Sequence, residues 1–332
     1  MAADKMKKSS KIVLVFALII LAAGLVTGGI FAKQLETLAT DLLSNLRYSG
    51  SAEISTIAEK IGLTGYGRFV FGATNPVVED RDSFNAHCNS YDEDTSTLGC
   101  FGGGRIYVYN IAASELAGIK ESTAAHELMH AVWSRLPSGE KDQLKTAILD
   151  AYNNSDAHES LKKELKNYGE DELLDELHSR LATEVKKLPE ELEKHYAKYF
   201  EDQDKVVDFY NNYREPFEKL DAEFQELSDA LEDVKTEFDE KQSEYIKRSE
   251  ALSREIAEFN ACADTLGCFS SQSTFNSRRN ELVAESSALD VLYEELSKLV
   301  DEYNAKVEAY NNSILRGEEL DSMMNSNSKI NL

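Results

Sequence analysis

Residues 122–133 read STAAHELMHAVW and carry two histidines, His126 and His130, four positions apart. On a helix this spacing places both imidazoles on one face, about one turn apart, so that they can hold one Zn²⁺ ion. Glu127 projects beside them, where its carboxylate can take a proton from water that the metal has acidified. We therefore predict a metal-binding helix over residues 114–136.

The flanking sequence predicts a mostly helical α+β fold around this helix. Residues 105–111, RIYVYNI, alternate β-forming side chains and predict a strand, and residues 68–72, RFVFG, predict another. Only 17 glycines and 4 prolines occur among 332 residues, which excludes an all-β fold built from many tight turns. Further helices are predicted over residues 33–64, 140–152, 156–167, 170–187 and 189–213, with a loop over 73–104.

The HExxH motif, on a helix that follows a strand, resembles the zincin metallopeptidases. In that family the motif helix lies beneath a small sheet, zinc is the cofactor, and the edge strand of the sheet aligns a peptide substrate. The resemblance covers about residues 65–190, and it implies that residues 105–111 form the edge strand.

The gluzincin branch of this family implies a third metal ligand. Its Asn-Glu-x-x-Ser/Ala-Asp pattern resembles residues 174–180, LDELHSR, in which Glu176 takes the ligand position. Asp175 and Arg180 depart from the pattern, and this leaves open which group orients the ligand imidazoles.

Other candidate ligands have weaker support. His178 and Glu184 are alternatives to Glu176, although His178 faces a different side of the same helix. Three further histidines lie in a loop or in charged helices and are expected at the surface: His87, His158 and His195.

The N-terminal segment predicts a membrane anchor. Residues 12–32 contain no charge and would span about 31 Å as a helix, close to the thickness of a bilayer core. Lysines cluster in residues 1–11, which predicts a cytoplasmic tip there and an extracytoplasmic location, at the cell membrane, for the rest of the chain. A cleaved signal peptide is the alternative, but its apolar core would normally be shorter.

The charged residues are distributed unequally on the two sides of this segment. The whole chain has 36 basic and 60 acidic residues, a formal charge of −24. Residues 1–33 hold five lysines and one aspartate, so residues 34–332 have 31 basic and 59 acidic residues, or −28. Such a surface repels polyanions, and we expect no nucleic-acid partner.

The predicted extracytoplasmic location is an oxidising compartment, so we expect the cysteines to form disulfide bonds. Cys88 is close in sequence to Cys100, as Cys262 is to Cys268, and the second cysteine of each pair lies in a TLGCF pentapeptide. We favour local pairing, although four cysteines allow three connectivities. The spacing does not match a CxxC-type metal site.

Residues 216–314 predict a long antiparallel helical hairpin. Apolar residues recur every seven positions over 217–259 and again over 275–310, as in a coiled-coil seam. A disulfide loop would close the tip, and residues 315–332 are expected to be disordered. The interleaved seam position of the first run becomes charged at Lys241, Arg248 and Glu255.

Together these features predict an anchored, extracytoplasmic zinc metallopeptidase with residues 33–215 as its catalytic domain. Its substrate would be a protein or peptide, bound along the edge strand. A different possibility is a cell-envelope interaction protein whose hairpin is the functional part, with a protein partner at the tip and a degenerate or structural zincin module. A third is a metal-dependent amidase that acts on cell-wall peptides.

Overall fold

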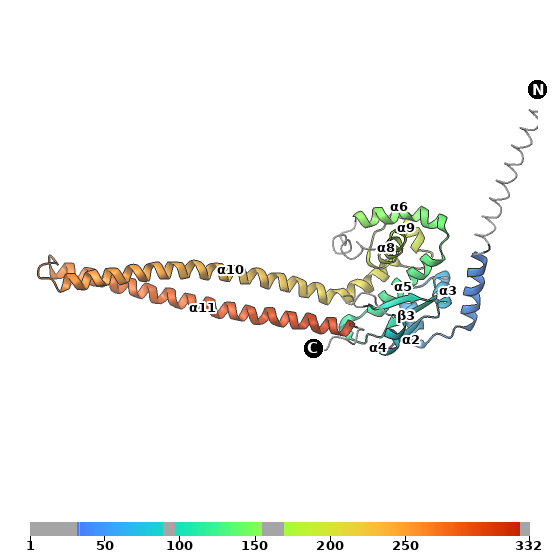
Figure 1. Ribbon diagram of the computed structural model, residues 1–332, viewed down its shortest axis with the longest axis horizontal. Coiled ribbons are helices and arrows are strands. Elements are labelled where there is room, and N and C mark those ends of the chain that lie inside the picture. The colour runs from blue at the N-terminus through green and yellow to red at the C-terminus, as the bar shows by residue number, and fades with distance from the viewer. Residues whose placement is uncertain (1–31, 33, 89–96, 155–168, 326–332) are drawn as a thin grey trace, which may run out of the picture. The chain divides into compact units, whose positions relative to one another are not determined.

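The computed structural model describes residues 32, 34–88, 97–154 and 169–325. The chain divides into two compact units, one of Met1–Pro216 with Ser322–Leu332 and one of Phe217–Asp321. The described residues are predominantly helical and include one three-stranded sheet, which belongs to the first unit (Figure 1).

The first unit combines the sheet with several helices of seven to 17 residues. Residues 34–47 are helical, and so are α2 (Ala52–Lys60), α3 (Gly65–Ala73), α4 (Arg81–His87), α5 (Ile119–Arg135), α6 (Ser138–Asn154), α8 (Glu170–Glu184) and α9 (Glu190–Tyr196), with a short 3₁₀ turn at Ser114–Leu116. The strands are β1 (Val77–Glu79), β2 (Gly99–Gly102) and β3 (Arg105–Tyr109).

The sheet has the order β1-β3-β2, with β1 parallel and β2 antiparallel to β3. The predicted strand at residues 105–111 therefore exists, but its expected place at the edge was wrong, since β3 is the central strand. The edge strand next to the helix with the HExxH motif is β2, within a stretch predicted to be loop. Four residues rich in glycine carry too little β-forming signal for a strand to be predicted there.

The strand predicted at residues 68–72 is wrong, because these residues form α3. The Thr64 side chain accepts a hydrogen bond from the backbone N–H of Gly67 and so caps the start of the helix. Gly67 also allows a close approach, since a Cβ there would lie 2.2 Å from the carbonyl oxygen of Tyr199. Helix capping and tertiary packing outweigh the β propensity of Phe69, Val70 and Phe71.

Helix α5 lies at the centre of the first unit, in contact with the sheet, with α2 and α3, and with α8. Ala124, Leu128 and Met129 are fully buried on it. The helix begins after Gly118, which has φ +99° and whose Cβ, if present, would lie 2.6 Å from the carbonyl oxygen of Phe209. It ends one residue before Leu136, which precedes Pro137.

Several helix boundaries differ from those predicted. The predicted helix over 33–64 is interrupted between residue 47 and α2, and the one over 170–187 ends at Glu184. The helix predicted over 189–213 is two helices, α9 and the start of α10, separated by residues 197–202. The helix predicted over 156–167 lies outside the described residues.

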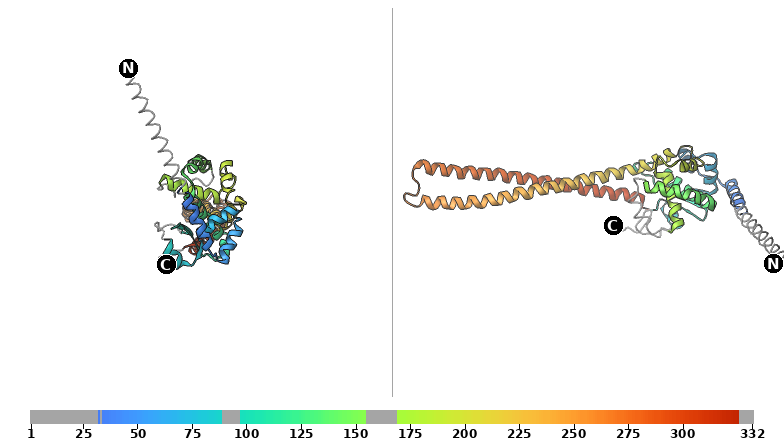
Figure 2. Two further views of the ribbon diagram at one scale, coloured as in Figure 1. Left: turned by 90° about the vertical axis from the view of Figure 1, so that its right-hand side faces the viewer. Right: turned by 90° about the horizontal axis from the view of Figure 1, so that it is seen from above.

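The second unit consists of two long helices that run antiparallel, side by side, as Figures 1 and 2 show. Helix α10 (Gln203–Ala263) starts in the first unit and continues through Pro216, and α11 (Gln272–Met324) returns. The helical part extends to Met324, so the expected disorder of residues 315–332 is wrong for residues 315–324. Three aromatic pairs bridge the two helices: Phe224 with Tyr310, Tyr245 with Tyr293, and Phe259 with Phe275.

The charged seam residues of α10 are paired across the second unit. Lys241 Nζ lies 2.6 Å from Glu295 Oε2, and Arg248 Nε lies 2.8 Å from Glu285 Oε1. Arg278 Nη2 lies 3.0 Å from an oxygen of Glu255 in the same way. These pairs continue the contact between α10 and α11 where the interleaved seam position is no longer apolar.

Both predicted local disulfides form. Cys88, which follows α4, bonds to Cys100 in β2, and Cys262 bonds to Cys268 at the turn between α10 and α11.

Among the described residues, no helix has both the length and the apolar character that a membrane crossing requires. The predicted anchor over residues 12–32 lies outside them apart from Ala32, and the predicted cytoplasmic tip over residues 1–11 lies wholly outside them.

Candidate metal centre

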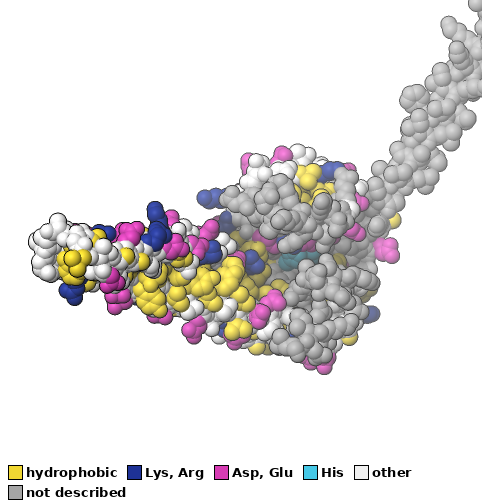
Figure 3. Space-filling view, turned by 60° about the vertical axis from the view of Figure 1, so that its left-hand side comes forward, with side chains coloured by type: hydrophobic (Ala, Val, Ile, Leu, Met, Phe, Trp, Pro, Cys, Tyr) yellow, Lys and Arg dark blue, Asp and Glu magenta, His cyan; other side chains and the backbone are white. Residues whose placement is uncertain are grey.

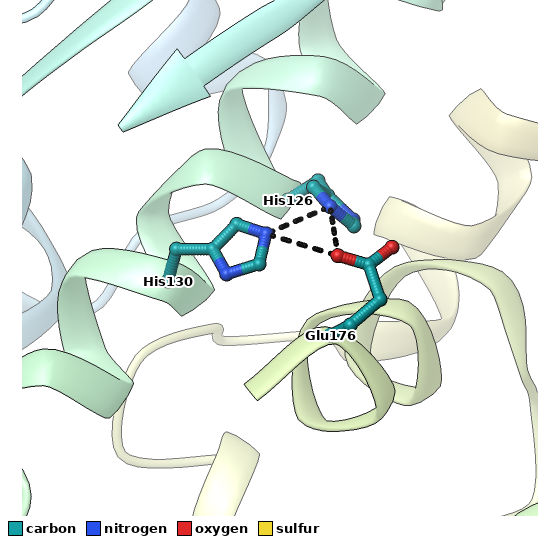
Figure 4. A group of neighbouring side chains, drawn as sticks. All are labelled: His126, His130 and Glu176. Carbon is teal, nitrogen blue, oxygen red and sulfur yellow. Dashed lines mark hydrogen bonds and ion pairs between the residues drawn. The ribbon is translucent and has the colours of Figure 1, made fainter. Parts of the chain in front are cut away.

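Helices α5 and α8 bring three potential metal ligands together (Figure 4). His126 and His130 lie one turn apart on α5, and Glu176 reaches them from α8. His130 Nε2 lies 3.1 Å from His126 Nε2 and 3.4 Å from Glu176 Oε2, and His126 Nε2 lies 3.9 Å from the same oxygen. Among the described residues this is the one group of His, Cys, Asp and Glu side chains close enough to share an ion.

The spacing of these atoms fits a tetrahedral zinc ion. Zinc bonds of about 2.0–2.1 Å at tetrahedral angles separate neighbouring ligand atoms by about 3.3–3.4 Å. Two imidazole nitrogens and one carboxylate oxygen also form the donor set of catalytic zinc sites, which keep their fourth position open. The residues present therefore fit the ion that the motif implies.

Neighbouring side chains on α8 hold two of the ligands. The Nδ1–H of His130 donates to Asp175 Oδ1 at 2.8 Å, which turns Nε2 towards the centre of the cluster. Arg180 Nε donates to Glu176 Oε1 at 2.6 Å and leaves Oε2 facing the histidines. The sequence left the orienting group open, and the structure places Asp175 in that position, directly before the ligand glutamate.

Burial and nearby charges shift the pKa values of the cluster residues in different directions. Burial lowers the pKa of His126 to about 3. Burial also acts to lower the pKa of His130, but hydrogen bonds to Asp175 and Glu176 outweigh it and raise that pKa to about 10. Burial acts to raise the pKa of Glu176, but the hydrogen bond with His130 and the charges of His126 and Arg180 hold it well below its usual range. The charged form of His130 is thus favoured by its hydrogen bonds to the Asp175 and Glu176 carboxylates.

Glu127 is buried beside the edge strand β2. Its pKa rises to about 7, because burial disfavours the charged form more than the neighbouring charge of His130 favours it. The backbone N–H of Phe101, in β2, donates to its carboxylate. Gly99 allows this approach, since a Cβ at that position would lie 2.9 Å from Glu127 Cγ and 2.5 Å from Thr123 Cγ2.

The outer edge of β2 presents backbone groups next to Glu127. The N–H of Tyr109 donates to the carbonyl of Leu98. In an antiparallel pair every second residue is hydrogen-bonded to the neighbouring strand, so Leu98, Cys100 and Gly102 are the residues bonded to β3. The N–H and C=O of Gly99 and Phe101 consequently point away from β3. Apart from the Phe101 N–H, which donates to Glu127, these groups form a short acceptor and donor edge beside the candidate base.

The structure separates the other candidate ligands from the cluster. His178 is fully buried, and its Nε2 lies 2.9 Å from Nε2 of His195, which is itself 3% exposed. The expected surface position of His195 is therefore wrong: α9 folds onto α8, and both imidazoles pack among aromatic rings. Glu184 lies beside Tyr210 and outside the metal cluster.

His87 and His158 complete the set of histidines. His87 is half-exposed, as expected, with its Nδ1 2.8 Å from Glu79 Oε2 and its ring stacked on Tyr107. His158 lies outside the described residues. Figure 3 shows histidine side chains reaching the surface of the first unit beside acidic side chains, which agrees with the partial exposure of His126 and His130.

Comparison of the chain with protein-family models, with curated protein sequences and with solved structures gives no match.

Proposed function

We propose that this chain is a zinc-dependent metallopeptidase that hydrolyses peptide bonds outside the cytoplasm while anchored by its N-terminal segment. The observation that carries the proposal is the convergence of His126, His130 and Glu176 within 4.8 Å of one another, on two helices, with Glu127 buried beside them. A zincin-like arrangement of a motif helix under a small sheet supports the same activity.

Zinc, when bound there, supplies Lewis-acid chemistry that polarises a carbonyl group and lowers the pKa of water. The chain itself orients the side chains that would bind the ion. Asp175 fixes the tautomer of His130, and Arg180 fixes the rotation of the Glu176 carboxylate.

Glu127 has the position required of a general base. Its carboxylate is held by the Phe101 N–H and faces the ligand side of α5, so it can accept a proton from an attacking water and return it to the leaving amine. Burial keeps bulk water away from this carboxylate and strengthens its interaction with charge that develops nearby.

The outward N–H and C=O of Gly99 and the outward C=O of Phe101 give a substrate peptide a strand to pair with, while the Phe101 N–H holds Glu127. An extended peptide that adds to β2 would run past Glu127, because β2 contacts α5 at that residue. This replaces residues 105–111, the central strand, as the proposed substrate-aligning strand.

The test is zinc content and peptidase activity of the purified full chain. We expect about one zinc per chain, and cleavage of an unfolded protein that is lost in Glu127→Gln while zinc is retained. The matched control is Glu121→Gln, which removes another buried carboxylate of α5 that pairs with Lys60 at 2.6 Å, away from the cluster. A folded wild-type chain that binds no zinc at neutral pH would exclude the proposal.

A second candidate, binding of a protein partner through the hairpin tip, has one observation in its favour. Leu266, inside the loop closed by Cys262 and Cys268, has its side chain fully exposed. The charged seam residues do not add to it, because each is paired within the hairpin. Leu266→Ser would abolish such binding and leave peptidase activity unchanged.

A further inference from the structure

The helix over residues 34–47 has one broad face without a charged residue. Five leucines on that face are 52–75% exposed, far more than leucines that pack in a core. At 100° per residue the face covers about 140° of the helix surface, which is typical of a helix that lies against an extended apolar partner. Its members are Leu35, Leu38, Ala39, Leu42, Leu43 and Leu46, the leucine face.

The opposite face of this helix is fixed to the first unit. Asp41 is buried and makes a two-point contact with Arg135, through Nε and Nη2, each at 2.9 Å. The amide of Asn45 donates to the carbonyl of Phe69 at 2.8 Å, and the Tyr48 hydroxyl donates to the carbonyl of Pro76 at 3.4 Å. The leucine face consequently cannot turn inwards unless these contacts break.

We propose that the leucine face lies on the surface of the lipid bilayer, with its side chains in the boundary between headgroups and acyl chains. The 21 uncharged residues of the predicted anchor, 12–32, are separated from residue 34 by one residue, Lys33. Each residue extends the chain by at most about 3.6 Å, so the short connection from the end of the anchor keeps Leu35 close to the membrane surface. An in-plane helix buries its apolar face about 5–10 Å into that boundary.

A second copy of the chain is the less suitable occupant. A two-helix seam would use only the narrow a and d positions, here Leu35, Ala39, Leu42 and Leu46, and would leave Leu38 and Leu43 at its margins. Fourteen residues also make a short helix, about 21 Å long, that contributes little association energy in water.

The proposed contact would orient the metal centre relative to the membrane. Arg135 is the last residue of α5, and its Nη1 also donates to the carbonyl of Ala131, one residue after His130. The ion pair between Asp41 and Arg135 thus joins the membrane-bound helix to the end of the helix that carries the metal ligands.

The test uses the full chain in phosphatidylcholine vesicles, with a fluorophore attached to one introduced cysteine. All four native cysteines are in disulfides, so the new thiol is the single reactive one. Leu42→Cys reports on the leucine face, and Thr40→Cys, exposed on the same helix but off that face, is the matched control. We expect lipids with a nitroxide in the acyl chain to quench Leu42→Cys at least about twofold more than Thr40→Cys.

Three outcomes would overturn the proposal. Equal quenching at the two positions with full access of iodide to Leu42→Cys would place the face in water. Disulfide cross-linking of Leu42→Cys between chains, without lipid quenching, would assign the face to a second copy. Absence of quenching at Leu21→Cys, in the predicted anchor, would show that the chain is not in the bilayer. None of these readouts depends on zinc or on peptidase activity.

Discussion

Two helix pairs in this protein, α5 with α8 and α10 with α11, both join acidic and basic side chains across their contact, with different consequences. Between α5 and α8 the charged groups are largely buried and converge on a few atoms around Glu176. Between α10 and α11 they are spread along the helices and partly exposed, as for Arg248 and Glu285. Burial concentrates charge into a binding site, whereas exposure lets water screen it.

Ion pairs indicate function only when burial and convergence accompany them. Burial shifts the pKa values of His126 and Glu127, whereas hydrogen bonds to two carboxylates raise the pKa of His130. The hairpin pairs hold two helices in register and leave the charges accessible to solvent.

The largest expected effect follows from removal of a ligand on α5. His126→Ala leaves two ligand atoms of three, so zinc content should fall from about one per chain to near zero, measured by elemental analysis after dialysis. His87→Ala removes a half-exposed histidine in the first unit and should leave zinc content unchanged. Equal zinc in both variants would contradict the assignment of the cluster.

A smaller loss of zinc affinity is expected when the residue that orients His130 is changed. Asp175→Asn removes the charge that accepts the Nδ1–H hydrogen bond and should weaken zinc binding by about 10–100-fold in a competition titration. The control on the same helix is Asp171→Asn, which is exposed. An unchanged dissociation constant for Asp175→Asn would mean that the ligand is oriented by other contacts.

Packing of β2 against α5 can be tested with two glycines of one strand. Gly99→Ala introduces a Cβ 2.5 Å from Thr123 and should lower the free energy of unfolding by about 1–3 kcal/mol. Gly102→Ala meets no atom within 4 Å and should be close to neutral. Urea unfolding of both variants gives the difference, and equal stability would show that β2 lies further from α5.

The smallest effect is expected in the hairpin. Arg248→Ala removes a partly exposed ion pair with Glu285, and the midpoint of thermal unfolding should stay unchanged within error. Leu289→Ala, which removes a buried side chain of the small cluster with Leu252 and Leu282, should lower it clearly. A larger loss for Arg248→Ala than for Leu289→Ala would reverse the contrast between the two helix pairs.

The sequence predicted features that depend on local spacing. The four-residue interval of the motif histidines and the seven-residue repeats specify helix faces directly, and both long helices and the placement of His126 with His130 agree with the structure. The pairing of the cysteines follows from short loops in the same way.

Features that depend on tertiary contacts were missed or misplaced. Residues 68–72 have β-forming side chains, but the Thr64 cap and packing against Tyr199 make them helical. The role of Asp175 depends on the angle at which α8 meets α5, and no local pattern encodes that angle. Likewise, the need for a glycine at position 99 is evident only from the packing of β2 against α5.

The bond between Cys88 and Cys100 limits how far the edge strand can open. A four-residue strand at the end of a three-stranded sheet has few backbone hydrogen bonds and would ordinarily exchange its amide protons early. The cross-link joins residues 12 positions apart, so an opened β2 remains a short closed loop and gains little chain entropy. The strand beside Glu127 is therefore stabilised against local unfolding by a covalent bond as well as by its own hydrogen bonds.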